Sequence, residues 1–293
     1  MTKNRFIGIG MLYMLSGAFF FSLMNSCLKV LSNSITTNEN MFFRSITMSM
    51  FIILIMIIKR KKTKKQRGGY LRLLTRVSMG TISLYTMLYN ISTIPLGTSI
   101  AFSQSMPIYT AILSWIFFKA RLNKSAILSI IIGFCGVILI SNPSAYNIHT
   151  INVIYGILSA MCAAFAFISI RSLKGYFSDL EIILSFGVFA SITSLIIIMI
   201  TQDNFSPIGI KDFIFIILTG ITGTIGQYYI TKAYMIAPPN IISPIDYTRI
   251  LFSLILGIIL GDVIPDMYSI FGIFLIIISG VLIALSAITP KAK

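Results

Sequence analysis

The sequence predicts an all-α integral membrane protein, with ten transmembrane helices forming two inverted five-helix repeats and both termini in the cytoplasm. Of the 293 residues, 56% are hydrophobic and only 11% are charged, and the mean hydropathy is +0.92. These values lie outside the range of soluble globular domains. Apolar windows long enough to cross a hydrocarbon core of about 30 Å recur along the whole chain. In lipid the backbone must satisfy its own hydrogen bonds, so these windows are expected to be helices.

Ten windows qualify as membrane spans. In chain order they cover residues 6–31, 39–58, 70–93, 97–118, 125–141, 152–172, 182–201, 212–235, 239–261 and 267–288. The first window is too long and too unlike a cleavable signal peptide to be removed. The longest polar linker is the basic segment KRKKTKKQRGG at 59–69. A separate soluble domain is therefore not expected.

The distribution of positive charge predicts the orientation. The net charge is +15, and with a cytoplasmic N-terminus the cytoplasmic loops and tails hold most of the 23 lysines and arginines. The four exceptions are Lys29, Arg44, Lys211 and Arg249. Such asymmetry follows the positive-inside rule. We expect the basic loop at 59–67 to orient the chain and to contact anionic membrane lipids, and we expect no nucleic-acid partner.

Several enzyme and cofactor classes lack their required residues. The three cysteines, Cys27, Cys135 and Cys162, fall inside predicted spans without metal-type spacing, and His149 is the single histidine. There is neither an H-E-x-x-H motif nor a phosphate-binding G-x-x-x-x-G-K loop. An intramembrane aspartyl protease would need a second aspartate at the depth of Asp246. We therefore predict no enzymatic activity, no cofactor and no metal.

An internal repeat divides the chain into residues 1–145 and 146–293. A shift of 142 residues places Lys29 on Arg171 and Glu39 on Glu181, and it brings the turn IPLG near the turn APPN. Each half then holds five spans, and an odd number makes the second half start on the opposite side of the membrane. Inverted repeats are typical of transporters that face the two sides of the membrane alternately.

These features carry a resemblance to a known family. The repeats, the proline-marked turn between the third and fourth spans of each half, the segment PIDYTRILFSLILGIILGD and the closing SGVLIAL resemble the drug/metabolite transporter superfamily, EamA type. The aromatic-rich ninth span and NMFFRS are similar to the group that includes S-adenosylmethionine carriers of intracellular bacteria. In the family the fourth span usually ends in an acidic residue. Here FFKARL has Ala120, while the second half keeps Asp262.

The ninth span contains the most conspicuous charged pair, Asp246 and Arg249. Asp246 lies about seven residues into the span, roughly 10 Å deep at 1.5 Å per residue. Charges at this depth are costly and face the interior of a helix bundle. At a spacing of i, i+3 the two side chains can touch. The pair could bind or gate a substrate, or it could only neutralise itself during membrane insertion.

Proline residues interrupt the fourth and ninth spans at corresponding places. Pro244 frees the carbonyl of Asn240, and Pro107 frees that of Ser103, one turn from Gln104. Interrupted helices at equivalent positions of two halves indicate a substrate site near the membrane midplane. We therefore place the site between these two spans, although proline kinks are also common in membrane helices without a site.

Further polar side chains are candidates for the same site. Arg44 either faces this cavity or extends outward to the membrane surface. Tyr85 and Tyr89 form one aromatic face, Gln227 is polar for its depth, and Tyr247 neighbours Asp246.

Residues near span ends are expected to play structural roles. Lys29 and Arg171 are expected to snorkel or to pair with Glu39 and Glu181. Trp115 is expected to anchor the membrane interface.

Together these patterns predict a multi-pass secondary transporter of a bacterial inner membrane. It would move a small organic metabolite by alternating access, with Arg249 and Asp246 as a switchable pair. The resemblance implies amino-acid-like or nucleobase-bearing substrates such as S-adenosylmethionine, or exported drugs. A passive channel and a structural or lipid-handling subunit are the alternatives. The sequence leaves direction, coupling and a possible homodimer open.

Overall fold

The protein is described by a computed structural model. It describes residues 2–59, 68–118, 124–140, 148–201, 205–237 and 242–288. Helices make up nearly all of this part of the chain, and the described β-structure is one isolated bridge between Lys174 and Phe177.

The helices follow the predicted spans closely. In chain order they are α1 (Thr2–Leu31), α2 (Thr37–Lys59), α3 (Tyr70–Thr93), α4 (Leu96–Ser103), α5 (Met106–Phe118), α6 (Lys124–Ile140), α7 (Thr150–Ser172), α8 (Asp179–Thr201), α9 (Ile210–Ile236), the 3₁₀ helix η1 (Ser243–Tyr247), α11 (Thr248–Ile259) and α12 (Met267–Ile288). Within the described residues, α1, α2, α7, α8 and α9 each contain a segment long and apolar enough to cross a membrane. Shorter apolar segments lie in α6 and α12.

Two predicted spans are interrupted rather than continuous. The span predicted at 97–118 is divided into α4 and α5 at Gln104 and Ser105, two residues before Pro107. The span predicted at 239–261 begins as the 3₁₀ helix η1, with a proline in its first turn, and continues as α11. Proline lacks the amide donor of a regular helix, and 3₁₀ bonding is a common adjustment at helix starts. Asn240, whose carbonyl Pro244 was predicted to free, lies outside the described residues.

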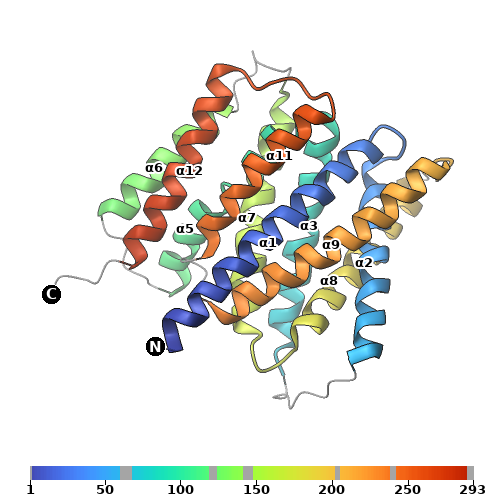
Figure 1. The fold of residues 1–293 in the computed structure, drawn as a ribbon, viewed down its shortest axis with the longest axis horizontal. Coiled ribbons are helices and arrows are strands. Elements are labelled where there is room, and N and C mark those ends of the chain that lie inside the picture. The colour runs from blue at the N-terminus through green and yellow to red at the C-terminus, as the bar shows by residue number, and fades with distance from the viewer. Residues whose placement is uncertain are drawn as a thin grey trace.

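The two halves of the chain pack mainly against each other. Helix α1 packs along α9, and α3 packs along α7. In the sequence repeat, α7 is equivalent to α1 and α9 is equivalent to α3. The α1–α9 contact and the α3–α7 contact are therefore equivalent contacts between the two halves. Helices α2 and α8 pack together, as do α6 and α12. Figure 1 shows the resulting interleaved bundle, in which α1 begins and α12 ends at the same end.

The opposite end of the bundle is tied by polar contacts between the halves. Lys29 Nζ lies 3.6 Å from Asp262 Oδ1 and donates to the Ile94 carbonyl at 2.9 Å. The Leu96 amide donates to Asp262 Oδ2 at 2.7 Å. The acidic residue that ends the ninth span thus satisfies the exposed amide at the start of α4. We call Lys29, Ile94, Leu96 and Asp262 the helix-end cluster.

This cluster corrects the expectation that Lys29 pairs with Glu39. Glu39 instead accepts hydrogen bonds from the Thr36 amide at 2.7 Å and from the Ser206 hydroxyl at 2.9 Å. A carboxylate in the first turn of a helix is well placed to satisfy free amides there. The partner of Lys29 comes from the far half of the chain, where local sequence could not reveal it.

Candidate functional site: a central polar cavity

A cavity lies where the interrupted helices of the two halves meet. Its volume is about 80 Å³. The side chains around it come from α1, α2, α3, α7, α8, α9 and the two interrupted segments. The lining residues are Phe21, Met24, Asn25, Arg44, Arg76, Gly80, Ser83, Leu84, Met87, Ser103, Gln104, Met106, Ser159, Ala163, Ala166, Phe167, Phe186, Gln227, Asp246 and Arg249. The lining thus combines arginines and neutral polar side chains with apolar side chains.

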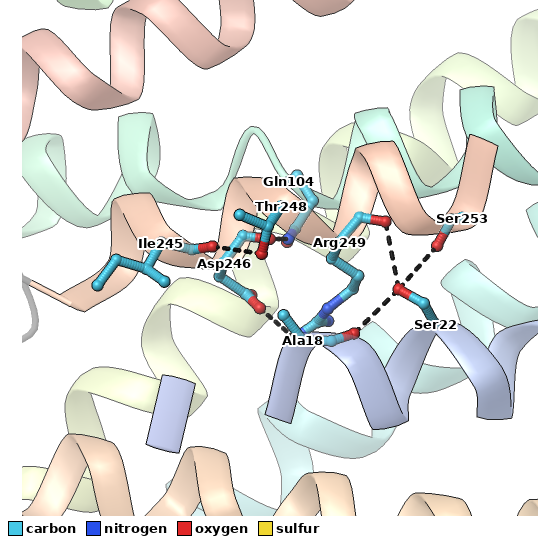
Figure 2. A network of polar contacts seen from close by, with 8 residues as sticks. All are labelled: Ala18, Ser22, Gln104, Ile245, Asp246, Thr248, Arg249 and Ser253. Atoms are coloured by element: carbon cyan, nitrogen blue, oxygen red, sulfur yellow. Dashed lines mark hydrogen bonds and ion pairs between the residues drawn. The ribbon is translucent and has the colours of Figure 1, made fainter. Parts of the chain in front are cut away.

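Asp246 and Arg249 form a buried ion pair on this wall. Arg249 Nη2 donates to Asp246 Oδ1 at 2.6 Å, across the junction of η1 and α11. The Arg249 guanidinium also lies 4.6 Å from the ring centroid of Phe21 on α1, a cation–π distance. In Figure 2 the Arg249 side chain reaches from α11 toward α1. The aspartate neutralises this arginine, so the pair adds no net charge to the cavity.

Backbone contacts hold the pair in place. Gln104, in the break between α4 and α5, donates from its amide nitrogen to the Asp246 carbonyl. The Ser22 hydroxyl on α1 donates to the Arg249 carbonyl at 3.3 Å and also contacts the Ser253 hydroxyl at 3.3 Å. These contacts link the broken fourth span, the broken ninth span and α1 at one point (Figure 2).

Two further arginines line the cavity with aromatic rings beside them. The guanidinium of Arg44 lies 5.9 Å from the centroid of the Phe186 ring, and that of Arg76 lies 4.7 Å from the same centroid. Arg76 also stacks on Phe167 at 5.4 Å. Only 3% of Arg44 and 2% of Arg76 is exposed. Arg44 therefore faces the cavity, which resolves the alternative that its side chain extends to the membrane surface.

These two cations are incompletely satisfied by the protein. Arg44 donates from Nε to the sulfur of Met24, a weak acceptor, and its Nη1 has no hydrogen-bond partner; nor does Nε of Arg76. A central arginine costs about 2.5–3.5 kcal/mol on insertion scales. Cation–π contacts contribute about 0.5–2 kcal/mol each. Stacking therefore offsets part of the cost, and hydrogen-bonding capacity is left over.

A neutral polar side chain adds to this capacity. Asn25, only 1% exposed, lines the same cavity with neither its amide nitrogen nor its oxygen bonded. Among the described residues no hydrogen bond joins the Asn25 side chain to another helix.

Two contacts relate the cavity to the internal repeat. Gln104 bonds to Asp246, and Arg44 stacks on Phe186. Each pair is separated by 142 residues, the shift that superposes the two halves of the sequence. A residue can touch its own repeat equivalent only near the axis that exchanges the halves. Equivalent positions of the two repeats therefore meet in the cavity wall.

The other predicted site residues lie at varying distances from this cavity. Gln227 lines it and donates to the Thr231 hydroxyl at 3.3 Å. Tyr247 is buried with its hydroxyl unbonded, and it is not among the lining residues. Tyr85 and Tyr89 stack edge-on against Tyr155, at 6.4 Å and 4.9 Å between ring centroids, and do not line this cavity. A substrate role for these three tyrosines stays a prediction.

Arg76 is the site residue that sequence reasoning missed. The positive-inside pattern counts Arg76 with the basic cytoplasmic residues that begin at Lys59, and the structure instead buries it inside the bundle. Its position was a usable signal, because Arg76 is the seventh residue of α3 and therefore lies about 10 Å from the helix start. The side chains of Trp115 and Arg171 lie outside the described residues.

Comparison with known proteins places this geometry in context. The profile of the EamA-like transporter family matches residues 8–142 and again residues 150–285. A Helicobacter pylori protein described as an uncharacterized transporter is 41% identical over 280 residues, covering 93% of each chain. The pseudopaline exporter CntI of Pseudomonas aeruginosa is 27% identical, covering 92% of this chain and 94% of its own. The S-adenosylmethionine uptake transporter of Rickettsia conorii is 21% identical, covering 89% of each.

The fold also matches a solved structure. One crystal structure superposes with a TM-score of 0.69, covering 99% of this chain and 100% of the other at 11% sequence identity. At that identity the match concerns the fold alone.

Proposed function

The chain belongs to the EamA-like transporter family, and from this premise we propose that it is a secondary transporter moving a small organic metabolite by alternating access. We further propose that it crosses a bacterial inner membrane ten times, as inverted repeats at 1–145 and 146–293. The substrate site is the central cavity. Relatives named as an exporter and as an uptake transporter are both similar to the chain, so the proposal includes no direction.

The observation that carries this proposal is the position of the cavity. It lies between the interrupted helices of both halves, and two contacts between repeat equivalents in its wall support a pseudo-two-fold axis there. In transporters with inverted repeats, the substrate site lies at the repeat interface, and rocking of one repeat against the other exposes it to either side. A cavity of about 80 Å³ is also smaller than the roughly 300–1,000 Å³ of typical ligand pockets. It therefore has to widen when a metabolite enters.

The Asp246–Arg249 pair provides a switch for this motion. A substrate group can take the place of one partner, and the pair can re-form after release. Asp246 and Arg249 each keep a bonded partner both when they are paired with each other and when a substrate group replaces one of them. The energy barrier between these two states therefore stays low. A passive channel would not need this exchange of partners.

Counter-exchange in proteoliposomes tests the proposal. Purified protein is reconstituted with an unlabelled metabolite inside, and entry of the labelled compound is followed across a panel of amino acids, nucleobase-bearing compounds and S-adenosylmethionine. Saturable uptake that is accelerated by internal substrate supports a transporter. Non-saturating flux without this acceleration would indicate a channel, and no flux of any compound would favour a structural or lipid-handling subunit.

Accessibility labelling tests the proposed orientation. A cysteine replacing Lys64, in the basic loop, is expected to resist an impermeant maleimide in intact cells. A cysteine replacing the exposed Ile208, near the start of α9, is expected to react. Cys27, Cys135 and Cys162 are replaced by serine in both variants and in their parent. The reverse labelling pattern would overturn the topology.

A further inference from the structure

The cavity carries more positive charge than its own acid can neutralise. Among the residues that line it, Arg44, Arg76 and Arg249 are cations and Asp246 is the one acid. Asp246 is bonded to Arg249. The wall that holds Arg44 and Arg76 therefore has two positive charges in excess.

The other described acids are committed at helix ends. Glu39, Asp179, Glu181, Asp212 and Asp266 accept hydrogen bonds from amides in or next to the first turns of α2, α8, α9 and α12. Asp262 binds Lys29 and the Leu96 amide. Each bonds a group at its own helix end or in the helix-end cluster. Among the described residues no acid compensates Arg44 and Arg76, and this points to a ligand as the source of the compensating charge.

The chemistry of the two arginines specifies that ligand. A guanidinium group is planar and always charged, and its fork of N–H donors matches a carboxylate in a two-bond arrangement. Arg44 and Arg76 stack on the same ring, that of Phe186, so two carboxylates bound to them would be separated by a short carbon chain. Met24, Leu84 and Met87 supply apolar wall for that chain.

Resting on the proposed function, we propose that the substrate of this cavity is a small organic anion with two carboxylate groups, bound by Arg44 and Arg76. Asn25 contributes a neutral donor and acceptor beside them. S-adenosylmethionine, with a sulfonium and an ammonium group against one carboxylate, is a net cation and is disfavoured by this charge.

Isosteric ligand pairs test the proposal by binding alone. Thermal unfolding of the detergent-solubilised protein is measured with succinate and with succinamate, and with glutamate and with glutamine. A ligand that binds only the folded state raises the unfolding temperature, and at equal concentration the tighter ligand raises it more. We expect succinate and glutamate to raise it, with affinities at least roughly tenfold above those of their amides, because a charge-assisted hydrogen bond is lost with each amide. Equal shifts within each pair, or larger shifts with S-adenosylmethionine or a phosphate monoester, would overturn the assignment.

Matched variants test whether the preference for dicarboxylates depends on the arginines of this cavity. Arg76→Gln is expected to abolish the preference for succinate over succinamate. Arg72→Ala is the control, since Arg72 lies one turn away on α3, is exposed, and stacks on Tyr176 at 5.3 Å; it is expected to keep the preference. Should Arg76→Gln fail to fold, Arg76→Lys retains the charge without the fork and is expected to keep a reduced preference. An unchanged preference in the folded Arg76 variant would refute the role of this residue.

Transport separates this inference from the proposed function. Exchange of dicarboxylates supports both. Exchange of neutral or cationic metabolites without competition by dicarboxylates contradicts the substrate class and leaves the transporter standing. Dicarboxylate binding without any exchange supports the ligand class and contradicts transport.

Discussion

The central cavity and the helix-end cluster contain the same kinds of charged groups in opposite states of compensation. In the cluster, Lys29 forms an ion pair with Asp262. Lys29 also donates a hydrogen bond to the Ile94 carbonyl, and Asp262 accepts one from the Leu96 amide. Around the cavity there are three arginines and one carboxylate, and that carboxylate is bonded to Arg249. The charges of the cluster are compensated within the protein, whereas Arg44 and Arg76 of the cavity have no acid partner among the described residues.

This difference distinguishes charged residues that stabilise the fold from charged residues that serve a function. Both regions join segments far apart in the chain, so both contribute to holding the halves together. The cluster is partly solvated, with 20% of the Lys29 side chain and 16% of the Asp262 side chain exposed, and water reduces the cost of its charges. The cavity arginines are almost fully buried. A charge kept there at a net cost to stability points to a function.

The largest expected effect is that of Arg249→Ala. Removing one partner of a buried ion pair leaves Asp246 without its bonded partner, at a cost of about 3–5 kcal/mol. We expect transport to fall at least roughly a hundredfold while membrane insertion is retained, as measured by initial uptake rate and by yield of monodisperse protein. The double variant Asp246→Asn/Arg249→Gln is the control. It should recover thermal stability without recovering transport. Normal transport by Arg249→Ala would remove the pair from the mechanism.

A smaller effect is expected from Gly80→Ala, which probes the packing of Arg76. A methyl group at position 80 would overlap Nη1 of Arg76 and approach Cε2 of Phe186 at 3.0 Å. Since both are side chains that can shift, we expect the protein to fold and substrate affinity to fall roughly three- to tenfold, because a small misplacement of a binding group is costly. Gly8→Ala, at a position with open space, is the matched control. Unaltered affinity in Gly80→Ala would show that the placement of Arg76 is unimportant.

Asp262→Asn should affect rates more than affinity. The asparagine keeps an acceptor for the Leu96 amide and loses the charge opposite Lys29, and a partly exposed ion pair contributes about 0–1 kcal/mol. We expect substrate affinity within twofold of wild type and a change of up to about fivefold in the exchange rate, since this end of the bundle would open more easily. Saturation curves separate the two quantities. A change in the order of preferred substrates would mean that the cluster belongs to the site.

The smallest effect is expected for Tyr85→Phe. Tyr85 packs edge-on against Tyr155, and the substitution keeps the ring that makes this contact. Uptake within twofold of wild type is expected. A loss above tenfold would extend the substrate site from the cavity to the face formed by Tyr85 and Tyr89.

The sequence predicted those features of the site that depend on residues close together in the chain. The Asp246–Arg249 contact follows from i, i+3 spacing, and the helix interruptions follow from Pro107 and Pro244, which act on their own turns. The outcome for Arg44 required the fold, because its helix could rotate the side chain toward lipid or toward the cavity. Arg76 was misassigned because it continues a basic run whose other members fit the positive-inside pattern.

The sequence by itself determined the class of molecule and the outline of its helices. In a hydrocarbon solvent, apolar segments of sufficient length can satisfy their backbone hydrogen bonds only as helices. The composition and length of these segments are therefore enough to predict the helices. Only the tertiary structure decided which charges are compensated. Partners such as Lys29 with Asp262, or Arg44 and Arg76 with Phe186, come from distant segments, and their meeting depends on how the two halves pack. Charge balance in a buried site is a property of that packing.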